Sequence, residues 1–192
     1  MKVMKPLLVL LGFMSFSATA QIFIGNYISY YSDKQLSRQL FDSINAYRNS
    51  VGQKSIIWEE NYYVTAKKHN DYLAQNGFWG HRNNGWGTEL IVGVTLTDYG
   101  NIDSKLYGLI IDSCIRQWQH SPAHHQSLIA PLLSSTQTSY KTKWDDVTFN
   151  AQCFKYGSVS VNVCYGLRGD KRMKHITCIL HLGAYTDPTK VW

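Results

Sequence analysis

The sequence predicts an α+β sandwich with helices in its first part and antiparallel strands in its last part. Apolar residues recur at three- and four-residue steps through the first part, as in amphipathic helices. From about Val147 onward the period changes to two, as in strands that bury one face. Helices followed by strands are typical of an α+β layer architecture.

Residues 1–20 have the features of a cleavable signal peptide. A lysine-containing start precedes an apolar run over residues 7–16, and residues 18–20 (Ala-Thr-Ala) form a small-x-small cleavage site. The run is too short to span a bilayer, and no later stretch is apolar enough to do so. We expect the mature chain to begin at Gln21, to have no transmembrane anchor after cleavage, and to be secreted or periplasmic.

The remaining residues suit one domain with its own core. Residues 21–32 are aromatic-rich and poorly periodic, which favours a leading arm, and residues 33–192 form the predicted domain. Removal of the signal peptide, with its two lysines and no acidic residue, lowers the formal net charge from +6 to +4. The basic residues are scattered, so the charge pattern argues against nucleic-acid binding.

Two helices are predicted in the first half of that domain. The first covers about residues 33–51, where Leu36, Leu40 and Ile44 share one stripe and Gly52 follows as a stop signal. The second covers about residues 60–76 and ends at Gly77.

A loop and two further helices follow. Residues 77–101 are rich in glycine and asparagine and are predicted to be a loop. Asp103 is the expected N-cap of a helix that ends near residue 119 and buries Trp118 and either Leu109 or Ile110. Ser121-Pro122 then opens a short helix that ends near residue 130.

The last part predicts a β-hairpin. Residues 157–166 and 174–183 alternate or are rich in β-branched residues, with a turn near residues 169–171. If the turn is centred on residue 171, Cys164 lies opposite Cys178.

Four cysteines are present, and export would permit two disulfides. The hairpin geometry favours Cys164 with Cys178, which leaves Cys114 with Cys153 as the second pair. The sequence alone does not separate the three possible pairings, and four buried thiols are the alternative. No cysteine spacing resembles a zinc site.

Two short segments contain residues that could carry chemistry. Residues 78–81 (Phe-Trp-Gly-His) end in His81, and Glu89 follows. Residues 118–125 (Trp-Gln-His-Ser-Pro-Ala-His-His) include His124. Imidazoles and a carboxylate can together bind a divalent metal or move protons.

Taken in order, these segments resemble the CAP superfamily, which comprises cysteine-rich secretory proteins, antigen 5 and pathogenesis-related 1 proteins, and bacterial members are the most similar. The resemblance covers about residues 36–183. Residues 44–52 are similar to the family's opening helix with its Asn-x-x-Arg, and residues 66–69 to its second helix. Residues 78–81, 87–90 and 118–124 resemble the segments that supply its first cavity histidine, first cavity glutamate and second cavity histidine.

The resemblance implies an α-β-α sandwich and a cavity lined by His81, Glu89 and His124, in which His81 and His124 could hold Zn²⁺. Three features depart from the family pattern. The family's Gly-Glu-Asn box is Gly-Thr-Glu here, at residues 87–89, so the glutamate is kept. The place of the family's second glutamate is taken by Ser121, for which Asp112 is a candidate substitute. Residues 132–156 are longer and more polar than the corresponding bacterial segment.

Other candidates have simpler interpretations. His69 lies on a helix stripe and is expected to pack or to form a hydrogen bond, and Ser121 is better explained as an N-cap than as a nucleophile. Surface positions are expected for His120 and His125. Two aromatic residues could line the cavity or close the core: Trp79 and Trp86.

Three functions are consistent with these residues. The favoured one is an exported binding or interaction module whose ligand is an unknown protein or a lipid- or sterol-like molecule, with or without a metal. The alternative is a metal-dependent hydrolase with Glu89 as general base. A third is a structural envelope protein that docks through residues 21–32.

Overall fold

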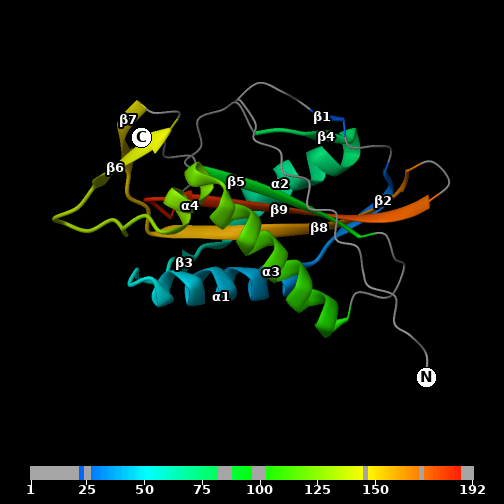
Figure 1. Cartoon of the computed structure of the whole chain (residues 1–192), viewed down its shortest axis with the longest axis horizontal. Coiled ribbons are helices and arrows are strands. Elements are labelled where there is room, and N and C mark those ends of the chain that lie inside the picture. Colours follow the sequence, from blue (N-terminus) through cyan, green and yellow to red (C-terminus); the bar gives the residue numbers. More distant parts are fainter. Residues whose placement is uncertain are drawn as a thin grey trace.

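Helices lie on both faces of a central sheet in the computed structural model of the chain (Figure 1). The structure describes residues 22–23, 27–81, 88–96, 103–144, 147–168 and 171–186, so the expected signal peptide and Trp86 lie outside it. The helices are α1 (Lys34–Ser50), α2 (Glu60–Asn76), α3 (Ser104–His120) and α4 (Pro122–Leu128). The strands are β1 (Ile22–Phe23), β2 (Tyr27–Ser32), β3 (Ile57–Trp58), β4 (Phe78–Trp79), β5 (Thr88–Leu96), β6 (Ser139–Trp144), β7 (Val147–Gln152), β8 (Tyr156–Arg168) and β9 (Lys171–Gly183).

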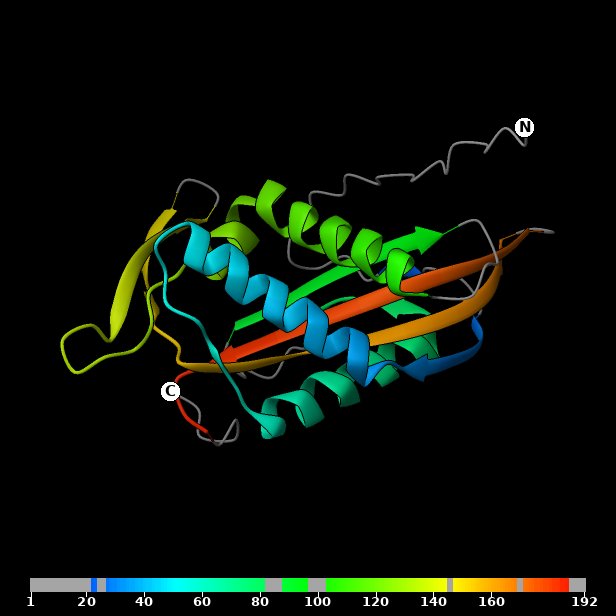
Figure 2. The same cartoon turned by 90° about the horizontal axis from the view of Figure 1, so that it is seen from below.

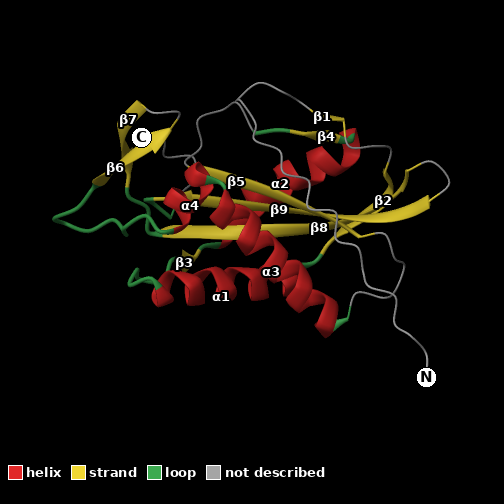
Figure 3. Cartoon of the chain, in the orientation of Figure 1, coloured by secondary structure: helices red, strands yellow, loops and turns green. Residues whose placement is uncertain are grey.

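The central sheet is built around the long β8–β9 hairpin. Its strands follow the order β2-β8-β9-β5 with antiparallel neighbours, and β3 adds a short parallel pairing to β8. A second hairpin, β6–β7, projects beyond one end of this sheet and occupies much of the long segment over residues 132–156 (Figure 2). The layers of helix, sheet and helix confirm the predicted α+β sandwich (Figure 3).

The face of the sheet toward α1 and α3 is apolar. Alternate residues of β8 (Val159, Val161 and Val163) are fully buried there with Leu40 of α1 and Ile110 of α3. Side chains alternate between the two faces of a strand, so the intervening residues of β8 point toward α2.

The face of the sheet toward α2 is unusually polar. Ala66 and Leu73 of α2 form only a small apolar cluster with the sheet. Asn70 supplements it, because its side-chain amide donates hydrogen bonds to the backbone oxygens of Ser160 (3.0 Å) and Thr177 (2.9 Å). This asymmetry leaves room for buried histidines and a carboxylate between α2 and the sheet.

The predicted helices are confirmed, and the cap residues explain their ends. Asp33 accepts a hydrogen bond from the backbone N–H of Leu36 at the start of α1, and Asp103 does the same for Leu106 at the start of α3. Gly77 ends α2 in the left-handed conformation, with φ of 63°, which a residue without a side chain adopts at little cost.

The Asn-x-x-Arg of α1 ties this helix to two other parts of the chain. Asn45 exchanges two hydrogen bonds with the backbone of Ile56, just before β3. Arg48 is fully buried, and its guanidinium donates to the backbone oxygens of Leu128 and Ala130, at and just after the end of α4. Arg48 therefore holds the C-terminal end of α4 against α1.

Two predicted segments are different in the structure. The loop predicted over residues 77–101 contains strand β4 and the nine-residue edge strand β5, so that prediction is wrong for residues 88–96. Residues 27–32 of the expected leading arm form β2, which pairs with β8.

The predicted register of the hairpin is also wrong. Cys164 lies opposite His175, and Cys178 lies opposite Val161. Residues 161 and 164 are an odd number of positions apart, so Cys164 and Cys178 point to opposite faces of the sheet and do not face one another. All four cysteines are buried thiols in the structure.

Candidate functional site

Glu89 lies at the start of the edge strand β5, on the face of the sheet that α2 covers. The next residue, Leu90, is buried on the opposite face in the apolar core. The register places Glu89 directly opposite His181 of β9, so the two side chains leave the sheet on the same side. Only 10% of the Glu89 side chain is exposed, and a buried carboxylate needs hydrogen-bond donors around it.

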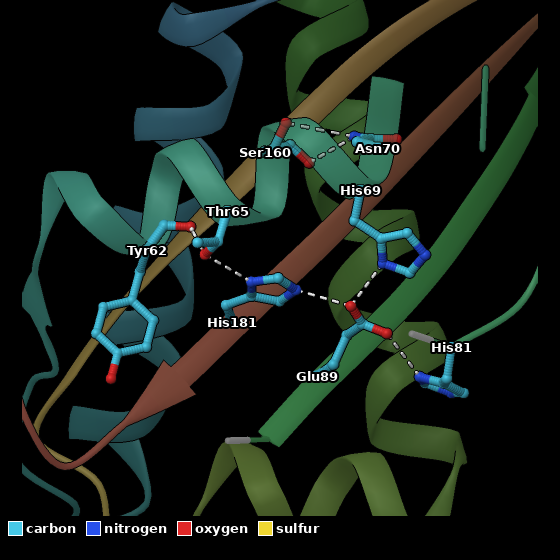
Figure 4. Close-up of polar contacts among 8 residues, drawn as sticks. All are labelled: Tyr62, Thr65, His69, Asn70, His81, Glu89, Ser160 and His181. Carbon is cyan, nitrogen blue, oxygen red and sulfur yellow. Dashed lines mark hydrogen bonds and ion pairs between the residues drawn. The ribbon is translucent and has the colours of Figure 1, made fainter. Parts of the chain in front are cut away.

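Two buried histidines provide such donors at one oxygen of Glu89. His69 of α2 approaches Oε2 through Nδ1 at 2.6 Å, and His181 approaches the same oxygen through Nε2 at 2.7 Å (Figure 4). Because an ionised carboxylate only accepts hydrogen bonds, both of these ring nitrogens carry the hydrogen. Thr65 of α2 lies 3.0 Å from the other ring nitrogen of His181 and fixes the orientation of that ring.

A third histidine, His81, contacts the other oxygen of the carboxylate. Its Nδ1 atom is 3.1 Å from Oε1 of Glu89, and about half of its side chain is exposed. The Nδ1–H therefore points to Glu89, and in the neutral ring the lone pair of Nε2 faces elsewhere.

These contacts determine the charge of Glu89. Burial alone raises the pKa of this carboxyl, but the hydrogen bonds from His181, His69 and His81 outweigh it and hold the pKa well below its usual range. Glu89 is therefore ionised at neutral pH, and it is a weak proton acceptor.

His124 lies next to His81. It lies in the first turn of α4, and the centre of its ring is 6.2 Å from that of His81. Burial, with a smaller contribution from His81, lowers the pKa of His124 to about 4. A neutral imidazole is the form that binds a metal ion.

Two sets of donor atoms in this cluster could hold a cation. His81 and His124 offer neighbouring imidazoles, with Glu89 behind His81 in the carboxylate–histidine arrangement that orients metal ligands. The second set comprises His69, Glu89 and His181, whose ligand atoms lie within 4.8 Å of one another. A cation in the second set would have to replace the hydrogens through which both histidines already bind Glu89.

The structure places His81 against Glu89, and the ring of His124 lies beside that of His81. Asp112 does not join them, because it is exposed on α3 and lies 3.9 Å from Arg116. Ser121 precedes α4 as predicted, but its side chain makes no capping hydrogen bond.

The outcome for the other candidates varies. His69 forms a hydrogen bond as expected, and His120 is exposed as expected. His125 was expected on the surface, but it is half-buried, with Nε2 at 2.7 Å from the hydroxyl of Tyr47. Trp79 lies in β4, and its side chain is outside the described part of the chain.

Sequence reasoning missed His181. The signal is the period of two in β9, where His175, Thr177 and His181 are polar and the residues between them are apolar. That alternation assigns His181 to the α2 face, but its partner Glu89 is 92 positions away along the chain.

Residues 41–153 match the family model described as "CAP: Cysteine-rich secretory protein family". The chain belongs to the CAP family. The matched range contains His69, His81, Glu89 and His124, whereas His181 lies beyond its end. None of the curated proteins matches this CAP chain. Among its described residues, no helix has both the length and the apolar character that crossing a membrane requires.

Proposed function

We propose that this CAP protein is an exported binding module that holds a divalent cation, in the first instance Zn²⁺, through His81 and His124. The main support for this proposal is the hydrogen bond from Nδ1 of His81 to Glu89, which orients the ring so that Nε2 can act as a ligand. The low pKa of His124 supports the proposal, since that ring is neutral and able to bind a metal at neutral pH.

Glu89 acts in this account through His81 and does not contact the cation. His69 and His181 both form hydrogen bonds to Oε2 of Glu89, which fixes the carboxylate so that Oε1 can accept the hydrogen bond from His81. When bound, the cation supplies a positive centre with only two protein ligands. Zn²⁺ usually takes four ligands, so the remaining positions are available to water or to a donor group of the molecule that the module binds.

The same contacts argue against hydrolysis with Glu89 as general base. An effective base has a pKa near the working pH, whereas three histidines hold the pKa of Glu89 well below its usual range. Both of its oxygens also already accept hydrogen bonds. The arrangement favours binding over proton abstraction.

Calorimetric titration of metal-free protein with zinc chloride tests the cation site. We expect one zinc per chain, and an affinity at least about 10-fold lower in His81→Ala and in His124→Ala. His120→Ala is the matched control, because His120 is exposed on α3 and its Nδ1 atom contacts the backbone oxygen of Arg116. Wild-type affinity in His124→Ala, or no binding by the wild type, would contradict the proposal.

Export is tested separately, by sequencing the N-terminus of the protein recovered from the producing cells. We expect extracytoplasmic material that starts at Gln21. A chain that stays in the cytoplasm with residues 1–20 attached would overturn this part of the proposal and leave the cation site unaffected.

A further inference from the structure

Two of the four cysteines meet in the core between α3 and β9. The sulfur atoms of Cys114 and Cys178 are 3.4 Å apart, and neither side chain is exposed. Cys114 lies on the face of α3 that packs on the sheet, and Cys178 lies on the apolar face of β9. Figure 1 shows α3 crossing in front of the strands of the central sheet.

The other two cysteines are placed differently. Cys164 leaves β8 on the opposite face of the sheet from Cys178, as the register requires. Cys153 follows β7, and its backbone N–H donates to the backbone oxygen of Thr138 at the base of the β6–β7 hairpin. Of the three ways to pair four cysteines, only one joins Cys114 to Cys178, the two cysteines whose sulfurs are in contact.

We propose that Cys114 and Cys178 form a disulfide in the exported protein, and that Cys153 and Cys164 remain thiols. The sulfurs, 3.4 Å apart, need to approach by about 1.4 Å to reach the length of a disulfide bond. Each thiol gives up one proton and one electron, and a disulfide of an exchange protein or of oxidised glutathione accepts the two protons and two electrons and becomes two thiols.

The bond has to form before the core closes. The thiolate is the reactive species in exchange, and burial together with Cys114 raises the pKa of Cys178 well above its usual value in the folded protein. Neither sulfur is accessible to an exchange partner once α3 has packed on the sheet. Oxidation therefore accompanies folding, and the finished bond resists reductants under native conditions.

The disulfide would join the two elements that flank the site. Helix α3 continues directly into α4, which carries His124, whereas β9 carries His181. A covalent tie between α3 and β9 fixes the support of His124 relative to the strand that pairs with Glu89. The tie also closes a loop of 64 positions, which restricts the unfolded chain.

Alkylation in denaturant followed by peptide mapping without reductant tests the proposal. The sample is the mature chain, folded in a glutathione redox buffer, so the result does not depend on export. We expect label on Cys153 and Cys164 only, and one cross-linked peptide that contains Cys114 and Cys178. Label on all four cysteines, or a link that includes Cys153 or Cys164, would overturn the proposal.

Variants provide matched controls. Cys164→Ala should keep the cross-linked peptide, whereas Cys114→Ala should lose it and expose Cys178 to label. Reduction should lower the unfolding midpoint of the wild type by roughly 5–15 °C and leave that of Cys114→Ala unchanged. Equal shifts in the two proteins would contradict the assignment, and the wild-type peptide map remains decisive if a variant fails to fold.

Discussion

His181 lies directly opposite Glu89 on the paired strands β9 and β5, and its Nε2 atom is 2.7 Å from Oε2 of Glu89. His69 reaches the same oxygen from α2, and His81 reaches the other oxygen. One carboxylate thus connects the helix layer, the sheet and the exposed histidine next to His124. The stability of the site should depend on the charge of that carboxylate.

Glu89→Gln is predicted to destabilise the protein by about 3 kcal/mol, because the amide cannot accept hydrogen bonds from three ring N–H groups at once. Zinc affinity should also fall, by about 10- to 100-fold, since His81 loses the acceptor that orients it. Urea unfolding and zinc titration measure the two effects.

The matched control for this variant is Glu60→Gln. Glu60 is about half exposed and pairs with Lys34 and Arg38 at the surface, so its loss should cost less than about 1 kcal/mol. Equal destabilisation by the two substitutions would show that the buried Glu89 contributes no more to the free energy of unfolding than an exposed glutamate, and would contradict the prediction.

Arg48→Met is predicted to destabilise the protein by about 2–4 kcal/mol, because buried backbone oxygens of Leu128 and Ala130 lose their donor. Urea unfolding measures the change. Arg38→Met is the control, since Arg38 is half exposed over the ring of Trp58, and its replacement should cost less than about 1 kcal/mol. Similar losses in the two variants would refute a special role of Arg48 in holding α4.

His175 is predicted to make stability depend on pH. Burial lowers its pKa to about 4, whereas the unfolded chain binds this proton near pH 6.5. The stabilising contribution is therefore complete above pH 6.5 and is lost as the pH falls toward 4, by on the order of 3 kcal/mol. Urea unfolding at several pH values measures this slope.

The slope should be shallower in His175→Gln, whose amide oxygen can still accept a hydrogen bond from the hydroxyl of Thr95, the neighbour of His175 at 2.8 Å. His120→Gln should retain the wild-type slope, because His120 is exposed. If both variants follow the wild type, His175 titrates normally and this prediction is wrong.

The helices could be predicted because their signals are local. Asp33 and Asp103 cap the first turns of α1 and α3, and Gly77 ends α2, so each boundary is encoded within a few residues. Strand β5 was missed because glycines and asparagines on both sides favoured a loop, although residues 92–96 alternate in burial. Of the two candidates for the buried residue of α3, Ile110 is buried and Leu109 is exposed.

The site could be predicted only in part. His81, Glu89 and His124 each lie in a short sequence motif, and such motifs can be recognised from neighbouring residues and from their order along the chain. His181 and the meeting of Cys114 with Cys178 depend on which strands pair and in which register. The hairpin register begins with Arg168 opposite Lys171. The small error in the predicted centre of the turn placed Cys164 and Cys178 on the same face, whereas they lie on opposite faces.

An anomalous difference map from crystals of the protein grown with zinc tests the central claim most directly. The account predicts the strongest peak beside Nε2 of His81, next to the ring of His124, with Glu89 still hydrogen-bonded to Nδ1 of His81. A peak among His69, Glu89 and His181, or no peak at the site, would contradict it.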